Sequence, residues 1–169
     1  MEKSSDSHSL QRDDELLTKF KLFAELSHEE LKTLIEQSSI VSFPARERII
    51  SAGESGHCMY VILSGKARVT TGSGDEEVEL AVLHPGDFFG EVSLVDDGPR
   101  SADVMALENC ELLCITRMTL GVLAGLQPGA AIHLLAAIGR CLVARLREGN
   151  QKYMDLIVLS RQFSEPQEL

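Results

Sequence analysis

The chain has 169 residues and a formal net charge of −10. Hydrophobic residues make up 44% of it and charged residues 25%, which is typical of one water-soluble domain with an appended element. Such an acidic chain is repelled by DNA phosphates and by anionic membranes, which argues against direct binding to either. No continuous apolar run approaches the ~20 residues of a membrane span. The segment Met1–Ser9 is too polar for a signal peptide, so we expect a cytoplasmic protein.

The N-terminal part is predicted to be a disordered tail at residues 1–11 followed by a helical lead-in at residues 12–39. From Asp13, apolar residues recur at helical spacing. They are Leu16, Leu17, Phe20, Phe23 and Leu26. Ser27 and Glu30 then form the pattern of a capping box, which predicts that a second helix begins here.

Residues 40–116 change to short β-rich runs separated by glycine-containing turns. The predicted strands are Ile40–Phe43, Arg48–Ile50, Met59–Ser64, Lys66–Thr71, Val78–Leu83, Phe88–Phe89, Ala102–Leu107 and Glu111–Thr116. Eight short, evenly spaced strands favour a small barrel or jelly roll. The fold class is therefore mainly β with flanking helices: an eight-stranded double-stranded β-helix.

Residues 117–160 return to a helical pattern. A short helix is predicted at Met118–Leu126, and a long one from Ala130 to about Ser160, with residues 161–169 as a tail. The long helix carries a heptad seam. Its members are Ile132, Leu135, Gly139, Leu142, Leu146, Gly149, Tyr153 and Leu156. The seam either packs on the chain's own barrel or joins two copies, and we favour a homodimer because the helix outruns a small barrel.

One stretch carries the chemistry. Phe88-Phe89-Gly90-Glu91-Val92-Ser93-Leu94 is followed, after a turn, by Pro99-Arg100-Ser101-Ala102. Unpaired backbone N–H groups at a helix start attract anions, and a guanidinium offers a planar fork matched to phosphate. A carboxylate beside a phosphate site is explained if the ligand also carries sugar hydroxyls, which a carboxylate accepts from. These residues point to a nucleotide whose ribose and phosphate are held close together.

FGEVSL followed by PRSA resembles the phosphate-binding cassette of the cyclic nucleotide-binding domain family, and LFAELSHEEL resembles the family's helical lead-in. The resemblance runs from about Leu16 to about Tyr153. It implies that Glu91 accepts the ribose 2′-OH and that Arg100 pairs with the cyclic phosphate. The complete set of predicted binding residues is Val69, Leu80, Phe89, Gly90, Glu91, Val92, Ser93, Arg100, Ser101, Ala102 and Arg145.

The parts of the site that would hold the base are less specific. Val69 and Leu80 are expected to line the base, although plain core positions have the same residue types. Arg145 either stacks on the purine as a cation over its π-face or is a solvated surface residue. We expect cAMP as the preferred ligand, while Ser101 would also suit a guanine, so cGMP stays open.

Other chemistries find little support. Cys58, Cys110, Cys114 and Cys141 form no CxxC pair and are expected to be buried thiols in a reducing cytoplasm. The alternative, a redox or iron–sulfur sensor, needs several closely spaced thiolates, which this spacing does not supply. The five histidines have no metal-ligand spacing, and we see no nucleophile with a base beside it. We therefore expect no metal and no enzymatic activity.

The sequence thus favours a cyclic nucleotide sensor in which ligand binding moves the C-terminal helix. An unidentified protein partner or a fused effector would respond to the movement of this helix. One alternative is a truncated or fused transcription regulator of the cAMP receptor protein class, although no helix-turn-helix fits after Ser160. The other is a ligand-free scaffold for protein contacts.

Overall fold

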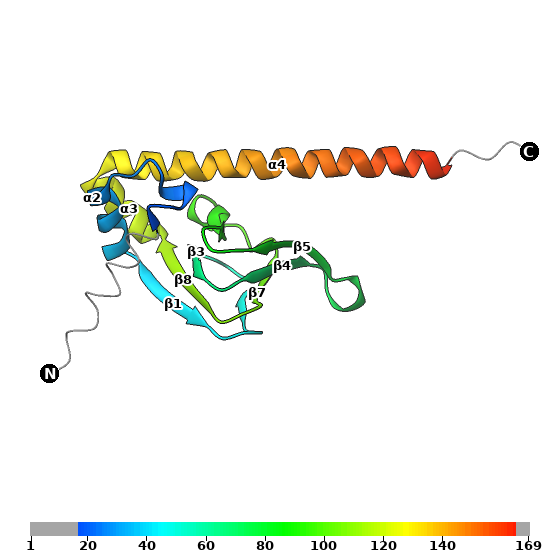
Figure 1. Cartoon of the computed structure of the whole chain (residues 1–169), viewed down its shortest axis with the longest axis horizontal. Helices are drawn as coiled ribbons and strands as arrows, with labels where there is room; N and C mark the ends of the chain where they lie inside the picture. The colour runs from blue at the N-terminus through cyan, green and yellow to red at the C-terminus, as the bar shows by residue number, and fades with distance from the viewer. Residues whose placement is uncertain (1–16, 165–169) are drawn as a thin grey trace, which may run out of the picture.

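The computed structural model describes residues 17–164, with the side chains of residues 17–160. Eight strands form two antiparallel sheets of four, in the orders β1-β8-β3-β6 and β2-β7-β4-β5 (Figure 1). The strands are β1 Ser39–Phe43, β2 Arg48–Ile50, β3 Cys58–Ser64, β4 Ala67–Thr71, β5 Val78–Leu83, β6 Phe88–Phe89, β7 Asp103–Ala106 and β8 Cys110–Thr116. Each predicted strand is present with its ends within one residue, and the predicted jelly-roll fold is confirmed.

Alternation along the strands divides the core in two. Met59 and Val61 of β3 are fully buried against the flanking helices, on the outer face of the first sheet. Ile62 of β3, Leu112 of β8 and Val104 of β7 belong to a second cluster, between the two sheets. The second cluster fills the barrel, while the first attaches the helices to it.

The predicted lead-in helix does not continue from Leu17 to Leu26. A short 3-10 helix, η1 (Lys21–Phe23), stands there, and Phe20 before it is extended, with φ −80° and ψ 131°. Leu22 is buried as well as Phe20 and Phe23. A continuous helix would point Leu22 about 200° away from Phe20, at 100° per residue, so the break lets both reach the core. Residues 12–16 of this segment lie outside the described residues.

The second predicted helix is confirmed as α2 (His28–Glu36). Ser27 N donates to Glu30 Oε2 at 2.8 Å, and Glu30 N donates to Ser27 Oγ at 3.3 Å. These two bonds are the predicted capping box, and they satisfy backbone donors that the helix itself leaves unpaired.

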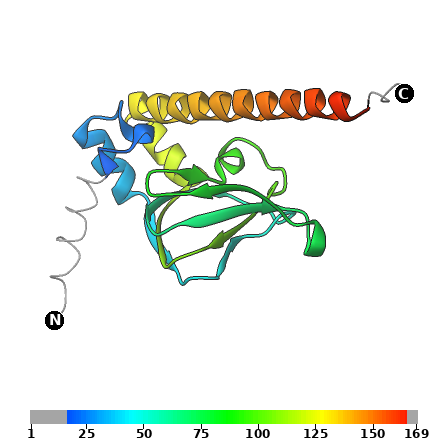
Figure 2. The same ribbon diagram turned by 45° about the vertical axis from the view of Figure 1, so that its right-hand side comes forward.

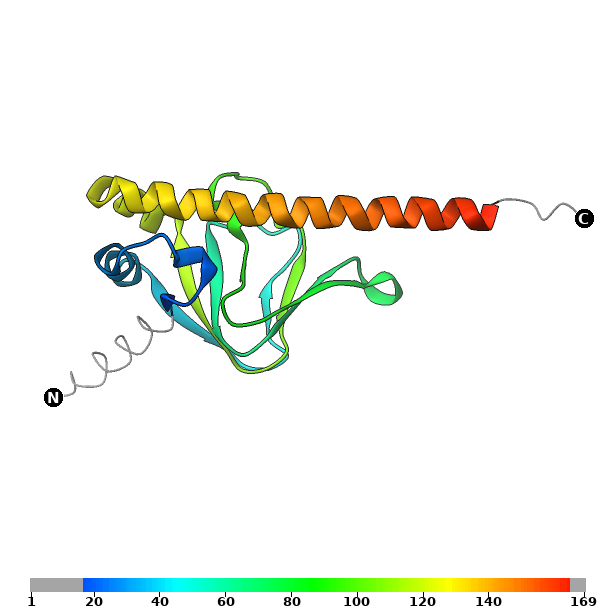
Figure 3. The ribbon, with the colours of Figure 1, turned by 45° about the horizontal axis from the view of Figure 1, so that its top comes forward.

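Two helices end the chain: α3 (Arg117–Leu126) and α4 (Pro128–Ser164). The first turns of α4 bury Ala130, Leu134 and Ile138 against the domain. Its later part extends past the barrel in all three views, on the same side as the β4–β5 hairpin (Figures 1, 2 and 3). The predicted tail at residues 1–11, and residues 165–169 of the predicted tail at 161–169, lie outside the described residues. Residues 161–164 belong to α4, so the helix ends later than predicted.

By length and composition alone, the Pro128–Ser160 part of α4 could cross a membrane. The sequence contains no apolar run long enough to predict such a segment, but the average hydropathy over the helix meets the criterion. The long helix of a water-soluble domain meets the same criterion, so this is weak evidence for a membrane.

Candidate ligand-binding site

A left-handed glycine forms the centre of the site. Gly90 follows β6 with φ 76° and ψ 11°, and a short 3-10 helix, η3 (Glu91–Leu94), begins directly after it. A Cβ atom at Gly90 would lie 2.5 Å from Arg100 Nη1 and 3.2 Å from the Cys58 carbonyl oxygen. Glycine is therefore required here both by the backbone angle and by the arginine packed against it.

Arg100 lies beneath this turn. Its Nη1 donates to the Gly90 carbonyl at 3.0 Å, and its Nη2 donates to the Cys58 carbonyl at 2.9 Å. Gly56 also leaves room for it, because a Cβ there would be 2.2 Å from Arg100 Nε. The two carbonyls use two of the five guanidinium N–H donors. The arginine is thus held in place while N–H groups stay available to an anion.

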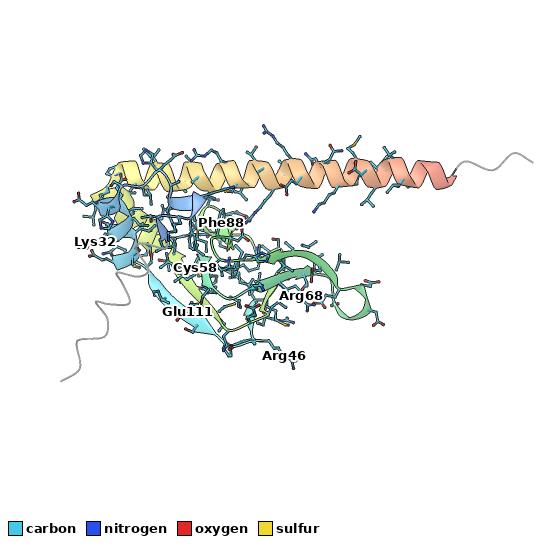
Figure 4. All side chains as sticks on the ribbon, viewed as in Figure 1. Lys32, Arg46, Cys58, Arg68, Phe88 and Glu111 are labelled. Carbon is cyan, nitrogen blue, oxygen red and sulfur yellow. The ribbon has the colours of Figure 1, made fainter. Side chains whose placement is uncertain are left out.

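Glu91 connects the turn to the C-terminal helix. Its side chain is buried, with the residue 8% exposed, and its Oε1 accepts from Arg145 Nη1 at 3.3 Å. Arg145 Nη2 also donates to the Phe88 carbonyl at 2.7 Å, and the Arg145 guanidinium carbon lies 4.7 Å from the centre of the Phe88 ring. Phe88 lies beneath α4 in Figure 4. Arg145 is therefore neither a free surface residue nor an isolated cation: it ties α4 to the turn.

Five more predicted residues surround the turn in different ways. Phe89 is buried, with its ring centre 5.4 Å from that of Tyr60. Ser93 is also buried, whereas Val92 and Ser101 are exposed. Phe89 and Ser93 support the turn from inside, and the side chains of Val92 and Ser101 reach solvent. Ala102, half-buried, leads into β7.

The pairing of β4 with β5 is irregular near the two residues expected to line the base. Val69 of β4 pairs with Ala81, but the next residue, Thr70, pairs with Glu79, so the register shifts at Leu80. Leu80 is 52% exposed, while Val69 packs against the cluster between the sheets. The irregularity explains why Leu80 does not continue the inward face of the strand. Their role as contacts of the base stays a prediction.

Arg117, at the start of α3, was not predicted. Its Nε donates to the Ser93 carbonyl at 2.6 Å, and its Nη atoms bond to the Asp97 carboxylate and the Asp96 carbonyl. The hydrogen bond and charge of Arg117 hold the pKa of Asp97 below its usual value. A lone arginine after a strand gives no sequence signal, because only the fold brings it to the turn.

The described residues contain no group of three or more His, Cys, Asp or Glu side chains placed to hold a metal ion. The charged side chains at the start of the turn are instead those of Glu91, Arg100 and Arg145, while Arg117 is paired with Asp97 after it. An anion and a hydroxyl-bearing group held side by side match these partners.

Two four-stranded sheets with flanking helices define the jelly-roll class of domain. A family model, cyclic nucleotide-binding domain, matches residues 40–124, half of this chain. The chain belongs to this family.

Individual relatives agree. The chain is 36% identical over 137 residues to a cyclic AMP receptor protein of Thermus thermophilus, covering 80% of this chain and 61% of that protein. It is 32% identical over 126 residues to a cGMP-dependent protein kinase of Eimeria tenella, covering 74% of this chain and 12% of the kinase. The crystal structure of a cyclic nucleotide-binding domain from Methylobacillus flagellatus superposes with a TM-score of 0.76 at 25% identity, covering 88% and 84% of the two chains. The chain thus spans under two thirds of the curated relatives' length.

Proposed function

We propose that this chain is a sensor for a cyclic nucleotide, with cAMP preferred over cGMP, and that binding repositions α4. The main support for this proposal is the Glu91–Arg145 contact, because it joins the turn to α4 through two residues that lie 54 positions apart in the chain. The relative from Thermus thermophilus is named for cyclic AMP, which favours cAMP. The named cGMP-dependent kinase makes cGMP the second ligand to test.

In the proposed complex, Arg100 faces the cyclic phosphate and Glu91 accepts the ribose 2′-OH. Val92 N–H and neighbouring backbone groups at the start of η3 complete the phosphate site, and Ser101 adds a hydroxyl from the opposite side. A charged partner makes these hydrogen bonds about twice as strong as neutral ones. Val69 on β4 is the proposed apolar contact of the base. The exposed Leu80 lies next to Ala81, the residue of β5 that pairs with Val69.

Ligand and helix are proposed to share Glu91. Arg145 contacts Oε1, and a carboxylate has a second oxygen that can accept from the ribose. A ligand that draws Glu91 toward itself changes the position in which Arg145 binds best. The equilibrium between positions of α4 then shifts by the difference in ligand affinity between them.

Titration calorimetry with cAMP, cGMP and 2′-deoxy-cAMP tests this proposal. We expect cAMP to bind most tightly, and its 2′-deoxy analogue to bind roughly 10- to 100-fold more weakly because Glu91 loses a hydrogen-bond donor. In the Glu91→Gln variant the difference between cAMP and the deoxy analogue should shrink. Absence of both heat and thermal stabilisation with either cyclic nucleotide at millimolar concentration would exclude the sensor function.

The seam of α4 supports a homodimer. Four side chains of the seam are between 63% and 65% exposed: Ile132, Leu146, Tyr153 and Leu156. Leu142, by contrast, packs against the chain's own core. Aspartate at both Leu146 and Tyr153 is therefore expected to produce monomers, because it places charges in an apolar seam. Light scattering measures the mass. Val143→Asp with Met154→Asp, on exposed positions beside the seam, is the matched control and should stay dimeric; a wild-type monomer would contradict the proposal.

We further propose a cytoplasmic regulatory module without catalytic activity of its own, whose movement is read by a partner protein or a fused effector. A regulator of the cAMP receptor protein class is the alternative, and the length of the Thermus relative beyond the match favours it as the second candidate. The acidic chain itself is proposed to bind neither DNA nor membranes. A mobility shift of promoter DNA caused by this chain alone would contradict that.

A further inference from the structure

Two thiols lie side by side next to Arg100. Cys58 is the first residue of β3, and Cys114 lies near the end of β8. In the ladder Cys58 faces Thr116 and Cys114 faces Tyr60, so both thiols and the tyrosine share one face of the sheet. Both cysteines are half-buried, and they are diagonal neighbours across the β3–β8 ladder. The pair sits at the strand ends, where the ladder opens most easily.

The surroundings of Cys58 favour its thiolate. The hydrogen bond from Cys114 contributes most to lowering the pKa of Cys58, and bonds from Tyr60 and Arg100 add to it. Arg100 Nη2 lies 3.8 Å from Cys58 Sγ. The same hydrogen bond raises the pKa of Cys114, as does burial, so the two thiols take opposite roles. A thiolate beside a guanidinium and partly open to solvent is the arrangement found at reactive cysteines.

We propose that Cys58 and Cys114 form an oxidisable dithiol, in which Cys58 reacts with a hydroperoxide and Cys114 resolves the product to a disulfide. Neither sulfur contacts the nucleotide in the proposed complex, and Cys58 meets Arg100 through both its carbonyl, at 2.9 Å, and its sulfur, at 3.8 Å. The thiol chemistry does not depend on the proposed function.

The reaction proceeds in two steps. The Cys58 thiolate attacks one oxygen of the hydroperoxide; the O–O bond breaks, the departing alkoxide or hydroxide takes a proton, and Cys58 becomes a sulfenic acid, oxidised by two electrons. Conversion of the Cys58 thiolate removes two causes of the raised Cys114 pKa, its hydrogen bond with Cys58 and the Cys58 charge. Cys114 then loses its proton and attacks the Cys58 sulfur; the S–O bond breaks, hydroxide leaves as water, and the S–S bond forms.

Peptide mass spectrometry of the wild-type chain tests the proposal. The rate of Cys58 alkylation by iodoacetamide should rise with a midpoint below about pH 7.5, and at pH 6 should exceed that of Cys141 on α4 by about tenfold. Hydrogen peroxide should link Cys58 to Cys114, with loss of two hydrogens. A midpoint near the ~8.5 of an ordinary thiol, or two intact thiols after peroxide, would overturn the proposal.

Matched variants separate the two roles. Cys114→Ser should stop disulfide formation and leave a sulfenic acid at Cys58 that dimedone traps, whereas Cys58→Ser should leave Cys114 unlabelled by dimedone. Circular dichroism before oxidation checks that both variants are folded. Dimedone labelling of Cys114 in the Cys58→Ser variant would contradict the assignment of Cys58 as the attacking thiol.

Discussion

Arg100→Gln is expected to weaken cAMP binding by about 3 kcal/mol, roughly 100-fold. The variant removes a positive charge and a planar donor pair from the proposed phosphate site. Glutamine is polar but ends about where Arg100 Nε stands, so the Gly90 and Cys58 carbonyls also lose their side-chain donors. Calorimetry gives the affinity, and thermal unfolding without ligand gives the effect on the empty fold.

Two further substitutions sharpen this test. Arg100→Lys keeps the charge but loses the fork, so its affinity should lie between those of the wild type and Arg100→Gln. Arg48→Gln is the matched control: Arg48 pairs with Asp103 at 3.3 Å on an exposed surface, and its loss should leave cAMP affinity unchanged. Equal affinities of wild type and Arg100→Gln would mean that the phosphate lies elsewhere.

Most of the fold could be predicted because its signals are local. The strand ends coincide with turn residues, and the capping box lies within the four consecutive residues from Ser27 to Glu30. The turn at Gly90 and the position of Arg100 were also recognisable, because the residues that form them lie ten apart in one segment. Local chemistry and fold agree in these regions.

The rest depends on contacts between distant segments. Leu22 interrupts the lead-in helix because the core, not the helical period, decides where it packs. The register shift at Leu80 follows from pairing with β4, which no single strand reveals. Arg145 and Arg117 reach the turn from α4 and α3. The residues around each arginine in the sequence do not indicate which residues of the turn it contacts. Long side chains on one element thus complete a site whose backbone was predictable.

Gly90→Ala is expected to lower the free energy of unfolding by at least about 2 kcal/mol and to abolish tight cAMP binding. A left-handed backbone costs an alanine roughly 1–2 kcal/mol. Its Cβ would also meet Arg100 Nη1 at 2.5 Å, so the guanidinium must leave the position that the site requires. Urea unfolding measures the first effect, and calorimetry with cAMP measures the second.

Two other glycines separate the causes. Gly74→Ala tests backbone strain alone, because Gly74 has φ 60° but nothing within 4 Å of an added Cβ; it should be destabilising and leave affinity unchanged. Gly121→Ala, in α3 with open space and no positive φ, should stabilise the helix by up to ~1 kcal/mol. The excess loss of stability in Gly90→Ala over Gly74→Ala then measures the displacement of Arg100. If that excess is absent and cAMP affinity is intact, the arginine is free to move, and the turn does not hold it for a ligand.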